Sequence, residues 1–193
     1  KCPDLPVLRD TKVVELIQDM DGQATLCKKF TNAATQFIRK NKKKPFFVYL
    51  PHAFVHGPRK ASPEFMAKAK TVEQAQIEEV DWSVGQILKT LREEGLAKNT
   101  LVLFTSDNGP AGRLSAGPLR GRKGTAFEGG QRVPTIVWWP GTIAAGTSSN
   151  EMTTAMDLHP TLAQLAGAKM PKDRVIDGKD VAPIILGKSG AKT

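Results

Sequence analysis

The chain has 193 residues, 40% of them hydrophobic, so it is long enough to bury a core, and its length suggests one domain. Its 28 lysines and arginines outnumber 19 acidic residues, but one tyrosine and the absence of a basic face interleaved with aromatics argue against a nucleic-acid-binding protein. No apolar run reaches the roughly 20 residues of a membrane-spanning helix, so we expect no membrane span.

The first 25 residues hold prolines and mixed polarity, which indicates an irregular or edge-strand segment. Apolar residues then recur at steps of three and four from Leu26 to Ile38, which predicts an amphipathic helix. The basic residues 39–44 would lie at its C-terminal end, where cations complement the helix dipole. Pro45 ends this helix, and the all-apolar residues 46–50 predict a short buried strand.

A loop rich in proline, glycine and histidine separates this strand from a second predicted helix, whose apolar face runs from Ile77 to Leu91. Residues 100–104 predict the next strand, and a long glycine-rich loop separates it from a third, residues 133–139. A shorter helix is expected around residues 160–166, with Pro160 in its first turn and Gly167 just past its end.

Strands without alternation, separated by helices, predict an α/β fold with a mostly parallel sheet and helices on both faces. Ligands of such sheets bind beyond the carboxyl ends of the strands. The loops expected at those ends carry the residues of most chemical interest. His52 and His56 follow the first strand, and Asp107 and Asn108 follow the second.

Asp107 and Asn108 supply oxygen ligands, the type that Ca²⁺ and Mg²⁺ prefer. The alternative is a tight turn, because Asn-Gly is a strong hairpin signal. A hairpin needs alternating strands, however, and here a solid apolar run precedes the pair and Pro110 follows it.

Lys123 lies in "PLRGRKGTAFEGGQRVP", where glycines allow close backbone approach to a ligand and cations can neutralise an oxyanion. The alternative is a flexible basic loop. His56 is a candidate proton donor or oxyanion contact, because histidine titrates near neutrality, although a lone loop histidine is commonly a surface residue. His52 has less support for the same role, and His159 is interpreted as structural.

Several segments resemble, in order and spacing, the later catalytic-domain segments of arylsulfatases in the alkaline-phosphatase superfamily. They are "FFVYLPHAFVHGP", "TLVLFTSDNGP", "PLRGRKGTAFEGGQRVPTIVWWPG", "MDLHPTLAQLAGA" and "DGKDVAPIILG". The similarity covers nearly the whole chain. It implies that residues 1–193 are a single partial sulfatase catalytic domain with an alkaline-phosphatase-like fold that is incomplete in this chain.

The resemblance implies hydrolysis of a sulfate monoester, on a sulfated small molecule or a sulfated glycan. It implies a divalent cation, Ca²⁺ in preference to Mg²⁺ or another metal, held partly by Asp107 and Asn108. It implies that Lys123 contacts the sulfate oxygens and that His56 contacts sulfate and helps the leaving oxygen depart. Relatives of this kind act outside the cytoplasm, in the periplasm or as secreted proteins, or in lysosomes.

The sequence also departs from the family pattern. Phe54 stands where a second histidine is frequent, and Arg122 where a small residue is common, so the substrate preference stays open. The family nucleophile is a formylglycine made from cysteine in Cys-x-Pro/Ala-x-Arg, and neither Cys2 nor Cys27 has that context. We expect the formylglycine on a segment outside this chain, along with the paired aspartates of the metal site and the C-terminal domain.

A parallel sheet that lacks its first strands leaves an apolar edge. The chain alone is therefore expected to aggregate or to need a companion chain that carries the rest of the domain. Two other functions are compatible with the residues: a phosphonate or phosphate ester hydrolase of the same superfamily, and a non-catalytic anion-binding module that uses the net charge of +9.

Residues 1–193 in isolation are expected not to turn over an aryl sulfate, because no cysteine in this chain has the context of the nucleophile. The measurement is release of 4-nitrophenol from 4-nitrophenyl sulfate, with 4-nitrophenyl phosphate alongside. Robust sulfate hydrolysis by the purified chain would contradict the assignment of the nucleophile to another segment.

Overall fold

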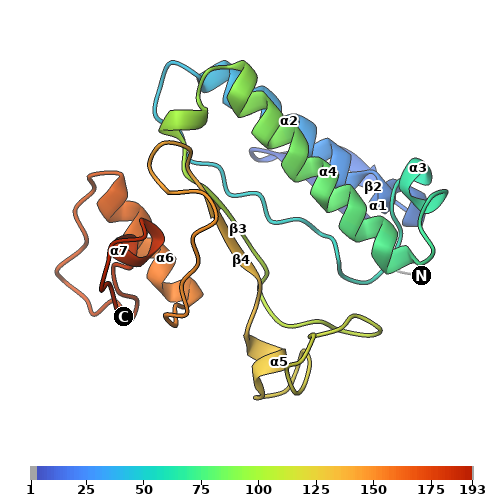
Figure 1. Ribbon diagram of the computed structural model, residues 1–193. Coiled ribbons are helices and arrows are strands. Elements are labelled where there is room, and N and C mark those ends of the chain that lie inside the picture. Colours follow the sequence, from blue (N-terminus) through green and yellow to red (C-terminus); the bar gives the residue numbers. More distant parts are fainter. Residues whose placement is uncertain (1–3, 193) are drawn as a thin grey trace. The chain divides into compact units, whose positions relative to one another are not determined.

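A computed structural model describes residues 4–192 of the chain. The chain divides into two compact units, one ending at Ala97 and the other beginning at Lys98, and each holds its own helices and its own pair of strands (Figure 1). None of the helices in this described part combines the length and the apolarity that crossing a bilayer requires. The assignment of the whole chain to one partial catalytic domain stays a prediction.

The first unit begins with an antiparallel hairpin of β1 (Leu5–Arg9) and β2 (Lys12–Ile17), followed by α1 (Met20–Ala24). The hairpin turns at Asp10, whose φ of 55° lies in the left-handed region that aspartate tolerates better than most residues. The edge-strand prediction for this segment is therefore correct in kind, and the strand finds its partner within the segment itself.

Two long helices, α2 (Leu26–Asn41) and α4 (Val72–Glu93), lie side by side and run in the same direction (Figure 1). Contacts between the two helices join residues that are 52 positions apart in the sequence, such as Thr31 with Ser83 and Lys42 with Glu94. The 16 residues of α2 rise about 24 Å. The chain must recover that distance before α4 begins, and it does so through residues 45–62 and the short α3 (Pro63–Met66).

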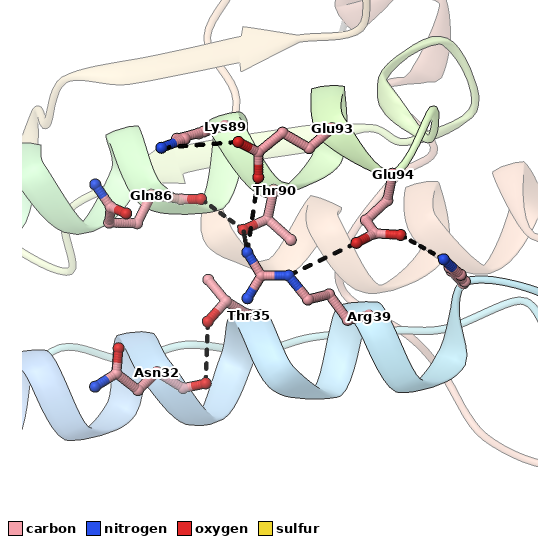
Figure 2. Close-up of polar contacts among 9 residues, drawn as sticks. Asn32, Thr35, Arg39, Gln86, Lys89, Thr90, Glu93 and Glu94 are labelled. Carbon is pink, nitrogen blue, oxygen red and sulfur yellow. Dashed lines mark hydrogen bonds and ion pairs between the residues drawn. The ribbon is translucent and has the colours of Figure 1, made fainter.

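Ion pairs join the C-terminal ends of α2 and α4 (Figure 2). The Arg39 guanidinium donates to Thr90 Oγ1 at 3.3 Å and lies 3.7 Å from carboxylate oxygens of Glu93 and of Glu94. Lys42 Nζ lies 2.7 Å from the second oxygen of Glu94. Two parallel helices bring the negative ends of their dipoles together, so the cations that α2 places there are stabilising, as the basic run predicted.

The interface between α2 and α4 is polar where the sequence predicted an apolar face. Ser83 of α4 is fully buried, and its hydroxyl lies 2.6 Å from that of Thr31 on α2. The fully buried Gln76 and Glu79 of α4 instead bond the Lys60 carbonyl and Ser62. Ile77, the first residue of the predicted apolar face, is 47% exposed, whereas Leu91, its last residue, is 1% exposed. The periodicity therefore located the helix correctly and its buried side only in part.

Residues 46–50 were expected to form a buried strand, and this expectation is wrong for the described part of the chain. Phe47 and Tyr49 are 72% and 79% exposed, and none of the five residues is assigned to a strand. A strand requires a neighbour to complete its ladder of hydrogen bonds. The described residues of this unit provide no such neighbour, and the segment instead runs along α2, where the Phe46 ring meets the Phe37 ring edge-on.

The short helix η1 (Ala97–Asn99) spans the boundary between the units, and the second unit is built on β3 (Val102–Thr105) and β4 (Thr135–Trp138). Both strands lie where the sequence placed them, but they pair antiparallel, with Val102 opposite Trp138 and Thr105 opposite Thr135. The parallel arrangement is therefore wrong for this pair. Parallel neighbours need a crossover such as a long helix, whereas the connection here is an irregular loop with the short α5 (Glu128–Gln131).

The helix predicted around residues 160–166 is α6 (Ala155–Leu165), followed by α7 (Ala182–Ile185). Pro160 lies inside α6 and not in its first turn, because a capping box at Thr154 and Asp157 starts the helix earlier. Burial opposes ionisation of Asp157, but N–H donors of Lys179 and Thr154 outweigh it and hold the pKa of this carboxyl below its ordinary value.

Replacing the buried Glu79 is expected to destabilise the first unit strongly. Its carboxylate accepts from the Ser62 N–H at 2.7 Å and from the Ser62 hydroxyl at 2.6 Å. Glu79→Ala leaves the Ser62 N–H buried without its acceptor and leaves the hydroxyl only the longer contact with the Ala24 carbonyl, at 3.3 Å, so the free energy of unfolding should fall by about 1–3 kcal/mol. Urea titration followed through the amide signals of α2 and α4 measures this. The matched control is Glu93→Ala, 49% exposed, and an equal loss in both variants would contradict the prediction.

Candidate functional site

Asp107 and Asn108 lie directly after β3, where the sequence predicted a pair of oxygen ligands. The Asn108 amide nitrogen donates to Asp107 Oδ1 at 2.7 Å, and the Ser106 hydroxyl donates to the Asn108 carbonyl at 3.1 Å. Asp107 is exposed and Asn108 is half-buried. Among residues 4–192 no hydrogen-bond partner is found for the other carboxylate oxygen of Asp107 or for the amide oxygen of Asn108. Two oxygen atoms from adjacent residues therefore stay available to a ligand.

The tight-turn alternative for Asn108-Gly109 is excluded. β3 and β4 do pair antiparallel, but the whole segment from Ser106 to Pro134 connects them. Gly109 serves another purpose, because its N–H donates to the Gly130 carbonyl at 2.9 Å. A Cβ on Gly109 would lie 2.0 Å from the Gly129 carbonyl oxygen, so two backbones touch where a side chain has no room.

Further backbone contacts fold the Lys123 loop against the segment that follows Asn108. The Lys123 N–H donates to the Pro110 carbonyl at 3.0 Å, and the Gly129 N–H donates to the Arg120 carbonyl at 2.7 Å. A Cβ on Gly129 would lie 2.5 Å from the Gly121 carbonyl oxygen. The glycines were expected to let the backbone approach a ligand. Here they let one stretch of backbone approach another, and this places the start of the Lys123 side chain beside the Asp107 segment.

Most cations of this loop are engaged within the protein. The Arg120 guanidinium stacks 3.8 Å from the centre of the Phe127 ring, and Arg122 donates to the Gly112 carbonyl at 3.1 Å. Lys123 differs, since its ammonium group is exposed and has no side-chain hydrogen bond or ion pair among the described residues. Arg113 is in the same state; sequence reasoning missed it, because nothing but its charge distinguishes it.

The available oxygens fit part of a site for a hard cation. Carboxylate and amide oxygens are the donors that Ca²⁺ takes, usually six to eight of them. The described residues contain no group of three or more His, Cys, Asp and Glu side chains able to hold a metal ion. The donor atoms of Asp107 and Asn108 thus have the right chemistry for a hard cation, and their role as metal ligands stays a prediction.

His56 belongs to the first unit and is exposed. Its Nδ1 lies 2.9 Å from the Gly57 carbonyl oxygen. A carbonyl can only accept, so Nδ1 carries the proton and Nε2 is left uncommitted. The structure groups Asp107, Asn108 and Lys123 in the second unit, and the juxtaposition of His56 with these three stays a prediction.

His52 is placed quite differently from His56. It is half-buried, with Nε2 3.3 Å from the Ser83 hydroxyl and Nδ1 3.8 Å from the Cys27 sulfur, and burial lowers the pKa of its imidazole. His159 is exposed on α6. His52 and His56 were predicted to have related roles, but their surroundings in the structure differ.

Cys27 is not placed as a nucleophile. Its side chain is buried, and burial together with the charge of Glu79 raises the pKa of the thiol to about 12. The reactive thiolate is therefore negligible at neutral pH. Cys2 lies outside the described residues.

Known sulfatases are similar to this chain along most of its length. A family model described as sulfatase matches residues 7–168. The steryl-sulfatase of Rattus norvegicus is 44% identical over 192 residues, which are 94% of this chain and 33% of that protein. The N-acetylgalactosamine-6-sulfatase of Mus musculus is 42% identical over 200 residues, which are 95% of this chain and 38% of that protein.

A solved sulfatase from Pseudoalteromonas sp. superposes with a TM-score of 0.83 at 28% identity, covering 91% of this chain and 37% of that one. The likeness confirms the alkaline-phosphatase-like α/β fold, present here in part. The chain spans about a third of the length of the curated relatives that it matches. With the family model matched over most of its length, the chain belongs to the sulfatase family.

Proposed function

We propose that the protein containing this chain hydrolyses sulfate monoesters with the help of a divalent cation, and that this chain supplies the sulfate-binding lysine, the acid at the leaving oxygen and part of the metal site. The observation that supports this proposal is the uncommitted ammonium group of Lys123. It starts from a loop whose backbone is joined to the segment carrying Asp107 and Asn108, in a chain of the sulfatase family.

Lys123 is the proposed contact to the sulfate oxygens. A sulfate monoester carries one negative charge spread over three terminal oxygens, and an ammonium group offers three donors. Because Lys123 has no partner among the described residues, binding sulfate breaks no existing ion pair. Arg122 would have to give up its contact with the Gly112 carbonyl to act in the same way.

Asp107 and Asn108 are the proposed ligands of the cation on this chain. Ca²⁺ fits better than Mg²⁺, because Ca²⁺ accepts amide oxygens in irregular shells whereas Mg²⁺ demands near-ideal octahedral geometry. When bound, such a cation would withdraw charge from the sulfate oxygens and stabilise the transition state. The remaining ligands and the formylglycine nucleophile are expected on a segment outside this chain.

His56 is the proposed acid at the leaving oxygen. The bond from Nδ1–H to the Gly57 carbonyl orients the ring and leaves Nε2 free. As an imidazolium, His56 can pass the Nε2 proton to the oxygen that leaves sulfur, so that an alcohol departs in place of an alkoxide. Acid catalysis of this kind contributes typically ~10²–10⁴-fold.

The substrate is proposed to be a sulfated small molecule or a sulfated glycan, since the relatives are named for a steryl sulfate and an amino-sugar sulfate. We place the protein outside the cytoplasm or in lysosomes, and we keep a companion chain as one way to complete the domain. A phosphonate or phosphate ester hydrolase shares the same oxyanion chemistry. A non-catalytic anion-binding module would bind sulfated polymers without any metal.

Lys123→Ala is expected to weaken inorganic sulfate binding by the 193-residue chain about tenfold, the loss of one charge-assisted contact. The measurement is a sulfate titration followed by amide chemical shifts in loop residues 110–132. Lys169→Ala removes the same charge from an exposed site of the same unit, so it controls for general electrostatic attraction. Equal weakening in both variants, or a larger loss in Arg113→Ala, would overturn the role of Lys123.

Asp107→Ala is expected to weaken Ca²⁺ binding at least about tenfold, because it removes the charged ligand of the pair. The side-chain amide signal of Asn108 reports binding directly, since this amide donates to Asp107 in the free protein. Asp173→Ala, which removes an exposed carboxylate elsewhere in the unit, should leave the Ca²⁺ titration unchanged. An Asn108 signal that ignores Ca²⁺ in the unsubstituted chain would contradict the metal assignment.

The same titrations separate the alternatives. Stronger binding of phosphate than of sulfate would favour the phosphonate or phosphate ester hydrolase. Salt-sensitive binding to heparin that ignores Ca²⁺ and Lys123 would favour the anion-binding module.

A further inference from the structure

His52 lies at the point where the return segment between α2 and α4 crosses both helices. Its Nε2 is 3.3 Å from the hydroxyl of Ser83 on α4, and its Nδ1 is 3.8 Å from the sulfur of Cys27 on α2. Both ring nitrogens are therefore directed at the helix pair. A histidine so engaged is not available to a substrate, although it stands four residues before the proposed acid.

The hydrogen bonds around His52 specify its protonation. The Thr31 hydroxyl donates its proton to the Cys27 carbonyl at 2.6 Å, so at 2.6 Å from Ser83 it can only accept. Ser83 must then donate to Thr31, and its oxygen is left to accept from His52. His52 consequently carries its proton on Nε2. Its Nδ1 carries no proton and lies 3.8 Å from the Cys27 sulfur, whose thiol donates to the Glu79 carbonyl at 3.6 Å.

The loop that carries His56 is held at both ends and free between them. His52 is the last residue before His56 with a polar contact to a helix among the described residues. The next such contact is Arg59, whose guanidinium lies 2.6 Å from the Glu73 carboxylate on α4. Between these two anchors the polar contact seen in the described structure is that of His56 with its neighbour Gly57.

We propose that His52 is a positioning residue: as a neutral Nε2–H imidazole bonded to Ser83 and packed against Cys27, it fixes the loop from which His56 reaches the leaving oxygen. The part that concerns the leaving oxygen rests on the proposed function; the fixing of the loop does not. Burial, which lowers the pKa of His52, keeps the imidazole neutral where an exposed histidine would gain a proton.

The test compares His52→Leu, which removes both ring contacts, with His52→Gln, which keeps an N–H donor for Ser83. The probes are ¹⁵N relaxation of the backbone amides of residues 53–57 and the long-range ¹H–¹⁵N spectrum of the three histidines in the 193-residue chain. In the unsubstituted chain we expect His52 as the Nε2–H tautomer and His56 as the Nδ1–H tautomer. His159→Leu, which alters an exposed histidine of the other unit, is the control.

In His52→Leu, the amide order parameters of residues 53–57 should fall to the values of a flexible loop, below about 0.6, and His56 should lose its Nδ1–H preference, whereas His52→Gln should restore both. Retention of the His56 tautomer and of high order parameters in His52→Leu would overturn the proposal. If His52→Leu also loosens α2 and α4, the deciding variant is Ser83→Ala, which removes the hydrogen-bond acceptor of His52 and leaves the imidazole ring in place. A loop 53–57 that is unchanged in Ser83→Ala would then overturn the proposal.

Both readouts are made without sulfate or metal, so they do not depend on the proposed function. Failure of Lys123 to bind sulfate would leave the positioning of the His56 loop standing. A normal sulfate titration combined with an unaffected loop would overturn the role of His52 alone.

Discussion

The parallel packing of α2 on α4 is the constraint that shapes the first unit. Because the helices run in the same direction and keep a 52-residue register, the chain must travel back along the pair before α4 can begin. That return segment carries the two histidines. The hydroxyl groups of Thr31 and Ser83 in the interface give it a polar contact point where an apolar seam would offer none.

In the second unit, contacts between backbone groups alone bring two distant segments together. Gly109 and Gly129 allow carbonyl and N–H groups to meet at distances that exclude a Cβ, and these contacts bring the end of β3 and the Lys123 loop together. Candidate groups in both units keep atoms that have no partner among the described residues: the ammonium of Lys123, one carboxylate oxygen of Asp107 and Nε2 of His56. Asp107, Lys123 and His56 are exposed, while neighbouring residues make the contacts that hold each unit together. This separation suits groups whose contribution is expected to come from contacts with a ligand.

Sequence reasoning located the elements better than it located their partners. Periodicity found α2 and α4, and apolar runs found β3 and β4, because these signals are local. The antiparallel pairing of β3 with β4 and the missing neighbour of residues 46–50 depend on distant parts of the chain, which no local pattern specifies. Pro160 was expected in the first turn of its helix. The capping box at Thr154 starts the helix at Ala155 instead, so the proline lies inside it.

The candidate site was predictable in its residue types and not in its arrangement. Oxygen ligands after a buried strand and a lysine in a glycine-rich loop were visible as chemistry, and the family resemblance supplied their roles. The division between His52 and His56 was not visible, since both lie in one loop of similar composition. It depends on Ser83 and Cys27, two small residues on separate helices that no motif connects to either histidine.

The same distinction bears on how a net charge of +9 relates to sulfate recognition. In the first unit Lys28, Lys29 and Lys60 are paired with carboxylates, as are Arg39 and Lys42. In the second, Arg120 lies on an aromatic ring and Arg122 on a carbonyl. Such cations attract an anion from a distance, but their donor groups are already engaged within the protein. The proposed recognition of a sulfate ester therefore relies on Lys123, an ammonium group without a partner among the described residues, and not on the total charge.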